Sequence, residues 1–231
     1  MTYVADRSGL STFGRAICTT ALAALTVLVC GCDGPSAKDQ DESVGAGQVC
    51  AGTLDASAAR ALERLSGTNR FEELTGTNEI GEPNAFSVKR AVQHLHATPS
   101  SRSSCTVYLA DDNSGMPLLD LDLSASQSHP KRTETNSSRK RLTYPMGVYA
   151  AATQTGTQLF FSCTTEAKSA DAYVGDTKYV EANMSFIGHA RGGDEGRDRM
   201  TVLNSVARAV ARAAGCATEA ALPTTVPPSV G

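Results

Sequence analysis

The chain opens with an apolar segment that is too short to cross a bilayer. Residues 16–29 are 14 residues without a charged side chain, and Arg7 and Arg15 lie ahead of them. A helix of this length rises about 21 Å, whereas the hydrocarbon core of a bilayer is about 30 Å thick. Positive charge ahead of a short apolar stretch is typical of an export signal. We therefore expect the rest of the chain to fold outside the cytoplasm.

The apolar segment ends in Val29-Cys30-Gly31-Cys32. This sequence resembles the bacterial lipobox, in which an aliphatic residue and a small residue precede a cysteine. The resemblance implies that residues 1–31 are a lipoprotein signal peptide and that the sulfur of Cys32 carries a diacylglycerol. Two or more acyl chains hold a protein stably on the outer side of the cell membrane. The alternative is an ordinary signal peptide that is cleaved nearby and leaves Cys32 as a free thiol.

Cysteine spacing predicts two disulfides in the exported part of the chain. Cys18 and Cys30 leave with the signal peptide, and an even number of cysteines remains beyond Cys32. An even number in an exported chain favours disulfides. The C-x-x-C spacing that is typical of a zinc site is absent from the sequence. Three pairings are open, and we favour the one that joins a cysteine beside a helix to a cysteine in an apolar strand, which is Cys50–Cys105 and Cys163–Cys216.

Composition divides the exported chain into three parts. Residues 32–49 are small and polar, which predicts a flexible tether. Residues 217–231 contain prolines without hydrophobic periodicity, which predicts a disordered tail. Residues 50–216 are left as a disulfide-bonded α+β domain.

Hydrophobic periodicity predicts the elements of that domain. Helical spacing covers residues 54–65, which Thr53 or Asp55 can cap and Gly67 can end, and it returns at 84–96 and 200–214. Alternating spacing predicts strands at 105–109, 119–123, 147–153, 159–163 and 179–186. Consecutive strands with short turns favour antiparallel pairing. We therefore expect an antiparallel sheet of four to five strands, with the N-terminal helices and the C-terminal helix on one face.

This layout resembles that of small secreted lipoproteins of high-GC Gram-positive bacteria. The resemblance rests on the lipobox, the tether, a cysteine ahead of an Ala-rich helix, and Gly215-Cys216 closing the last helix. Many of those proteins belong to families of unknown function. The resemblance therefore implies a location and a layout, but no catalytic residue.

Several function classes lack the residues that they require. A net charge of −3 does not suit a nucleic-acid binder, and no Trp supplies a stacking platform. The hydrolase motifs G-x-S-x-G, S-x-x-K and H-E-x-x-H are absent from the sequence. His94 and His96 lie on different sides of a helix, and we expect them, His129 and His189 to be solvated surface residues. We therefore predict no catalytic residue, no cofactor and no metal.

Two loops carry weaker signals. Asp111 to Gly115 is rich in oxygen ligands, but its register does not match a calcium loop, so a hairpin turn is the better interpretation. Residues 188–199 place glycines ahead of a helix, as phosphate sites do, yet Asp194 and Glu195 would repel an anion. We expect a connector in which Asp194 or Glu195 caps the helix.

Basic charge gathers in residues 129–141, where five basic residues accompany a single acidic one. Our hypothesis is that this loop touches anionic lipid or an anionic wall polymer, since each basic residue near such a surface contributes about 1 kcal/mol. The alternative is a solvated loop. The five basic residues are Lys131, Arg132, Arg139, Lys140 and Arg141.

The sequence thus predicts where the protein lies better than what it does there. We expect a lipid-anchored extracytoplasmic domain that binds a protein partner, a small apolar ligand or an envelope component, and that is not an enzyme. The alternatives are an envelope hydrolase with an unrecognised site and a spacer. A cavity lined by Ser, His and Asp would favour the hydrolase, and an apolar patch would favour a protein partner.

Overall fold

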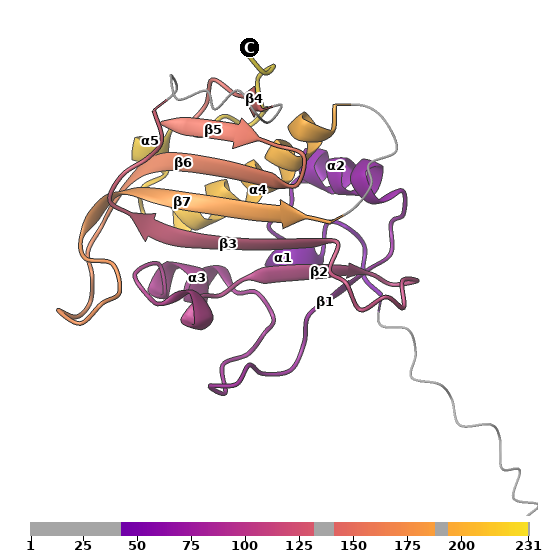
Figure 1. Cartoon of the computed structure of the whole chain (residues 1–231), viewed down its shortest axis with the longest axis horizontal. Coiled ribbons are helices and arrows are strands. Elements are labelled where there is room, and N and C mark those ends of the chain that lie inside the picture. Colours follow the sequence, from indigo (N-terminus) through magenta and orange to yellow (C-terminus); the bar gives the residue numbers. More distant parts are fainter. Residues whose placement is uncertain (1–42, 132–140, 188–193, 231) are drawn as a thin grey trace, which may run out of the picture. The chain divides into compact units, whose positions relative to one another are not determined.

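The computed structural model describes residues 43–131, 141–187 and 194–230, which form an α+β fold around one antiparallel sheet (Figure 1). The sheet has seven strands in the order β1-β2-β3-β7-β6-β5-β4. Their bounds are β1 Phe71–Glu73, β2 Cys105–Leu109, β3 Leu119–Ser126, β4 Leu142–Thr143, β5 Tyr149–Ala152, β6 Gly156–Thr165 and β7 Thr177–Phe186.

Two meanders make up the sheet. β1, β2 and β3 pair in sequence along one half, and β4, β5, β6 and β7 pair in sequence along the other. The halves meet where β3 runs antiparallel to β7 over the whole of β3, from Leu119 opposite Phe186 to Ser126 opposite Tyr179. The long β3–β7 pairing therefore joins the halves into one continuous sheet.

Strict alternation on the central strands gives the sheet one apolar and one polar face. Leu119, Leu121 and Leu123 are buried in the core, while Asp120 and Asp122 between them lie on the opposite face. Side chains of successive strand residues point to opposite faces, so the main core forms on one side, and that side is covered by helices. A small cluster of Tyr149, Ala151 and Phe160 is buried on the other face.

The helices are α1 Val49–Gly52, α2 Ala56–Ser66, α3 Val88–Gln93, α4 Glu195–Ala213 and α5 Ala217–Ala220, with a 3₁₀ turn η1 at Pro99–Ser101. α4 lies across β5, β6 and β7, and α2 packs on α4 (Figure 1). Asp55 caps α2 by accepting the N–H groups of Ser57 and Ala58, and Gly67 ends it with a left-handed φ of 73°. These are the cap and the stop that the sequence predicts.

The expected count of four to five strands is wrong, although the fold class is right. All five predicted strands are present, and the two missed strands are the edges β1 and β4. They have three and two residues. A strand so short shows no alternation that a sequence pattern can detect.

The predicted tether (32–49) and the predicted disordered tail (217–231) both include residues that pack on the domain. Val44 pairs with Phe71 beyond β1, and Ala46 and Val49 are buried, so residues 43–49 belong to the domain and not to a tether. At the other end, Val226 is buried and Val230 pairs with Thr143 beyond β4. The described part of the predicted tail, residues 217–230, is therefore packed and not disordered.

The second helix is shorter than the apolar stripe over 84–96 predicts. α3 starts after Ser87, whose hydroxyl accepts the N–H of Arg90, and it ends before His94. Asn84 is not the cap, since its side-chain amide donates to the carbonyl of Thr75. Leu95 continues the apolar stripe but belongs to the turns that lead to β2.

Candidate binding pocket

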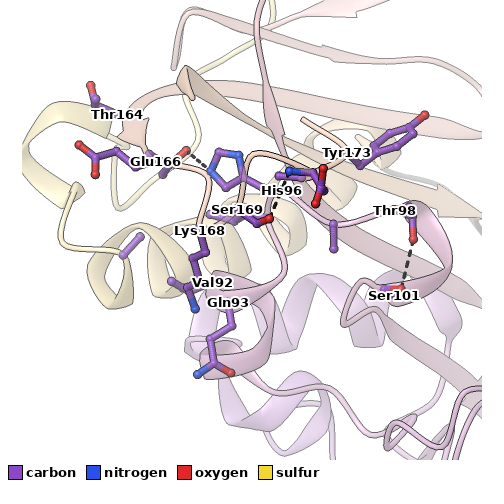
Figure 2. A pocket seen from close by; sticks show the side chains of 16 residues that line it. Val92, Gln93, His96, Thr98, Ser101, Thr164, Glu166, Lys168, Ser169 and Tyr173 are labelled. Atoms are coloured by element: carbon purple, nitrogen blue, oxygen red, sulfur yellow. Dashed lines mark hydrogen bonds between the residues drawn. The ribbon is translucent and has the colours of Figure 1, made fainter. Parts of the chain in front are cut away.

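A cavity of about 660 Å³ lies where α3, the end of β6, the β6–β7 hairpin and the last turn of α4 meet (Figure 2). We call it the hairpin pocket. Its floor consists of buried and half-buried apolar residues, and its rim is polar and largely exposed. The floor is formed by Val92, Leu95, Ala97, Ala172 and Ala214, and the rim includes Gln93, Thr98, Glu166, Lys168, Ser169, Asp171 and Tyr173.

The wall formed by the hairpin starts at an irregularity in β6. The pairing of β6 with β7 shifts register between Ser162 and Thr165. Such bulges bend a strand and occur often beside functional sites. Here the two strands resume pairing at Thr165 and Thr177, and the hairpin then extends past the sheet beside α3 (Figure 1).

His96 joins this hairpin to the end of α3. Its Nδ1 lies 2.9 Å from the carbonyl oxygen of Val174 and 3.0 Å from that of Gly175, and its Nε2 lies 3.0 Å from the hydroxyl of Thr165. The carbonyl of His96 also accepts the N–H of Val174. Carbonyl oxygens only accept hydrogen bonds, so Nδ1 carries the proton.

Three charged side chains on the rim have no ion-pair partner among the described residues: Glu166, Lys168 and Asp171. Figure 2 shows Lys168 extending toward Val92 and Gln93 of α3, whereas the carboxylate of Glu166 points away from them. The charges of Lys168 and Glu166 are thus separated in space and available to a ligand.

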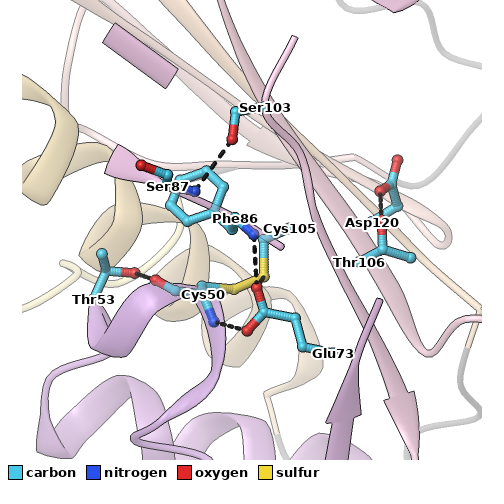
Figure 3. Close-up of a disulfide and its surroundings, with 9 residues drawn as sticks. All are labelled: Cys50, Thr53, Glu73, Phe86, Ser87, Ser103, Cys105, Thr106 and Asp120. Carbon is cyan, nitrogen blue, oxygen red and sulfur yellow. Dashed lines mark hydrogen bonds between the residues drawn. A yellow bond between two sulfur atoms is a disulfide. The ribbon is translucent and has the colours of Figure 1, made fainter. Parts of the chain in front are cut away.

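Each disulfide lies next to a glutamate that accepts two hydrogen bonds. Cys50 and Cys105 are bonded, and so are Cys163 and Cys216, which confirms the favoured pairing. Beside the first bridge, Glu73 accepts the N–H groups of Cys50 and Phe86 (Figure 3).

Glu219 of α5 plays the matching part at the second bridge, where it accepts both the N–H and the hydroxyl of Thr164. Thr164 also lines the hairpin pocket. The bridge between Cys163 and Cys216 therefore fixes the pocket wall to the end of α4.

The histidines that we expected on the surface are half-buried and hydrogen-bonded. His94 meets the carbonyl oxygen of Ser101 at 2.6 Å, and the ring of His129 packs edge-on against Tyr179 at 4.9 Å. The prediction of solvated side chains is wrong for these two and for His96, because each ring fills a space between elements. His189 lies outside the described residues.

The loops with weaker signals act as turns and caps. Asp112 accepts the N–H and hydroxyl of Ser114 within the β2–β3 turn. No group of three or more metal-binding side chains occurs in the described ranges. Asp194 caps α4 by accepting the N–H of Arg197, as predicted, and residues 188–193 lie outside the described part.

Two of the five basic loop residues lie in the part that the structure describes. Lys131 is exposed, and Arg141 is half-buried and donates a hydrogen bond to the phenol of Tyr149 at 3.1 Å. Arg132, Arg139 and Lys140 lie outside the described residues, as does Cys32 with the whole lipobox. Within the described ranges, no helix combines the length and the apolarity that a membrane span requires.

No sequence pattern predicts the hairpin pocket. Its residues come from segments that are far apart in the sequence, and their apolar members are small or belong to helix stripes. The stretch from Glu166 to Asp176 was the available signal, because eleven residues without strand alternation between two strong strands mark a long hairpin. No protein-family model, curated protein or solved structure matches the chain at a significant level.

Proposed function

We propose that this chain is a lipid-anchored extracytoplasmic domain that binds a small ligand in the hairpin pocket and does not transform it. The observation that carries the proposal is the pocket, whose volume of about 660 Å³ lies within the roughly 300–1,000 Å³ of small-molecule sites. In such sites the apolar lining supplies most of the affinity, and a few polar groups fix the orientation of the ligand.

Filling the pocket tests the proposal. Ala172 is half-buried in the lining, so Ala172→Trp would occupy the space, whereas the neighbouring Ala170 is exposed and outside the lining. We expect a small molecule to copurify with the wild-type protein and with Ala170→Trp, and to be absent from Ala172→Trp, by mass spectrometry of solvent extracts. Identical extracts from all three proteins would contradict ligand binding in this pocket.

The anchor is proposed from the lipobox and agrees with the two disulfides, which form in oxidising compartments outside the cytoplasm. Cys32→Ala should move the protein from the membrane pellet to the soluble fraction. Cys32 carries the acyl chains in this proposal, so continued pelleting of the variant would refute it.

The second candidate, an envelope hydrolase, has one observation in its favour. Nε2 of His96 lies 3.0 Å from the hydroxyl of Thr165, a distance at which a base can activate a nucleophile. Among the described residues, Nδ1 of His96 faces two carbonyl oxygens and no carboxylate, and the Thr165 hydroxyl also contacts that of Thr177 at 3.1 Å. This arrangement favours a structural network.

A hydrolase would lose activity on 4-nitrophenyl acetate with Thr165→Val and retain it with Thr165→Ser. We expect no turnover above background from the wild-type protein or from either variant. Turnover by the wild-type protein and Thr165→Ser, but not by Thr165→Val, would favour the hydrolase over the ligand-binding protein.

For the basic loop we propose contact with an anionic surface. The protein without its acyl group should float with liposomes that contain anionic lipid and stay behind with neutral liposomes. Exchange of Lys131, Arg132, Arg139, Lys140 and Arg141 for Gln should abolish flotation. Equal flotation after the exchange would show that the loop is not the contact.

A further inference from the structure

We infer that the ligand of the hairpin pocket is an amphiphile with an apolar chain and an anionic head group, which Lys168 recognises. The inference rests on the proposed function and names the ligand class of the same site. It follows from how apolar and charged groups are distributed over the lining.

The floor suits an apolar chain. Leu95 is 1 % exposed, and Val92, Ala97, Ala172 and Ala214 around it are half-buried. These side chains carry no hydrogen-bonding group, so a polar ligand placed on them would lose its contacts with water. Each CH₂ group of an apolar chain buried there strengthens binding about fourfold. The chain therefore supplies most of the affinity.

The rim supplies a cation and hydroxyl donors at the edge of this floor. Lys168 extends toward Val92 and Gln93 without an ion-pair partner among the described residues (Figure 2). The hydroxyl of Thr98 lies 3.1 Å from that of Ser101 and 3.3 Å from that of Ser100, so the three hydroxyls share two hydrogen bonds and one proton is left for a ligand oxygen. An ammonium group and hydroxyl protons together favour a carboxylate or a phosphate.

The two acidic residues of the rim decide between an anionic and a cationic ligand. Glu166 points away from Val92 and Gln93 in Figure 2, and Asp171 is an exposed residue of the hairpin whose backbone N–H donates to the hydroxyl of Ser169. Lys168 is the charged group that we place over the apolar floor. A cationic head group would have to leave that floor to reach Glu166.

Binding of four twelve-carbon probes tests the inference. The described residues lie in one compact unit, so the chain from Asp39 to Gly231 can be titrated by calorimetry below the micelle concentrations. The probes are dodecanoate, the lauroyl lysophospholipid of phosphatidylglycerol, dodecan-1-ol and dodecylammonium. We expect both anions to bind at least tenfold more tightly than dodecylammonium. The tighter anion tells whether a fatty acid or a phospholipid head group is preferred.

Lys168→Met should weaken binding of the preferred anion about three- to tenfold, the range for a partly solvated ion pair, and should leave dodecan-1-ol unchanged. Lys178→Met is the matched control, because Lys178 is also exposed but lies outside the hairpin pocket. Dodecylammonium binding as tightly as the anions, or equal losses in Lys168→Met and Lys178→Met, would overturn the inference.

The same experiment separates this inference from the proposed function. If dodecan-1-ol binds as tightly as the anions, and Ala172→Trp abolishes its binding, the pocket binds apolar ligands and only the anionic head group is wrong. If no probe binds and nothing copurifies with the wild-type protein, both the ligand class and the proposed function fail.

Discussion

The carboxylate of Glu73 accepts the backbone N–H of Cys50 at 2.9 Å, directly beside the disulfide to Cys105. Its other oxygen accepts the N–H of Phe86 at 3.1 Å. One side chain of the edge strand β1 thus satisfies two backbone donors, in α1 and in the segment that leads to α3. Buried donors cost free energy when they lack a partner, so Glu73 is a structural residue.

Replacing Glu73 should therefore lower stability although it lies in a short strand. Glu73→Ala leaves two donors without partners, and we expect a loss of about 2–4 kcal/mol in the free energy of unfolding by urea denaturation. Glu73→Gln keeps one acceptor and should lose less. Glu72→Ala, at the exposed neighbouring position, is the control. Equal effects at both positions would contradict the role of Glu73.

The backbone that Glu73 holds is left-handed at two residues that are not glycine. Cys50 has φ 52° and Ala51 has φ 57°. A left-handed conformation costs a residue with a Cβ about 1–2 kcal/mol, and glycine avoids this cost.

Ala51→Gly should consequently raise the free energy of unfolding by about 0.5–1 kcal/mol, because Ala51 is exposed and loses no packing. Ala59→Gly in the middle of α2 should lower it by a similar amount. Thermal denaturation of both variants gives the comparison. A loss of stability in Ala51→Gly would show that this turn is not left-handed in solution.

Glu181 on the polar face of the sheet makes stability depend on pH. Burial raises the pKa of its carboxyl, and the nearby charge of Asp122 adds to this, while a hydrogen bond from Asn183 acts in the opposite direction. The folded state then holds the proton more tightly than the unfolded state. Ionisation of Glu181 therefore destabilises the fold above its raised pKa, and the penalty disappears as the pH falls to the ordinary value.

Glu181→Gln removes this ionisation and leaves an oxygen that can accept the bond from Asn183. We expect the variant to be more stable than wild type at pH 7 by up to about 1 kcal/mol, since solvent screens a half-buried group. The difference should shrink at pH 4, where the wild-type carboxyl is protonated. Urea denaturation at both pH values, with Glu72→Gln as the exposed control, checks the sign. An equal gain at both pH values would contradict the titration.

The sequence predicts those helices and strands whose hydrophobic residues recur at a regular spacing and whose ends carry capping residues. Leu119, Leu121 and Leu123 alternate with aspartates and lie in a central strand, and the cap Asp55 and the stop Gly67 bound α2 as expected. The favoured disulfides follow from the same elements. Patterns of this kind are local, so they need no knowledge of the neighbouring strands.

What the sequence does not predict depends on contacts between distant segments. β1 and β4 are strands because longer strands pair with them, and their few residues show no period. The hairpin pocket likewise arises only when α3, β6 and α4 meet. The structural role of His96 is evident only from the fold, which places the carbonyls of Val174 and Gly175 around its ring. The composition of the C-terminal segment, with its prolines and threonines, predicts disorder, whereas its described part packs on the domain.

That C-terminal segment packs through a small number of contacts. The side chain of Val226 is 2 % exposed, and its carbonyl accepts two hydrogen bonds from the guanidinium of Arg197 on α4. The amide of Asn204 donates to the carbonyl of Pro223, and the N–H of Val230 donates to Thr143 at the edge strand β4. Residues 223–230 thus run from α4 to the edge of the sheet.

Val226→Ala should lower the free energy of unfolding by about 1–2 kcal/mol, because it removes two buried methyl groups and leaves a cavity. Val230→Ala is the matched control, since that side chain is 52 % exposed and should cost less than about 0.5 kcal/mol. Hydrogen exchange should show the same contrast, with protection of the Val230 N–H reduced in the first variant. A tail that did not pack would give equal stabilities for both variants and rapid exchange at Val230 in the wild-type protein.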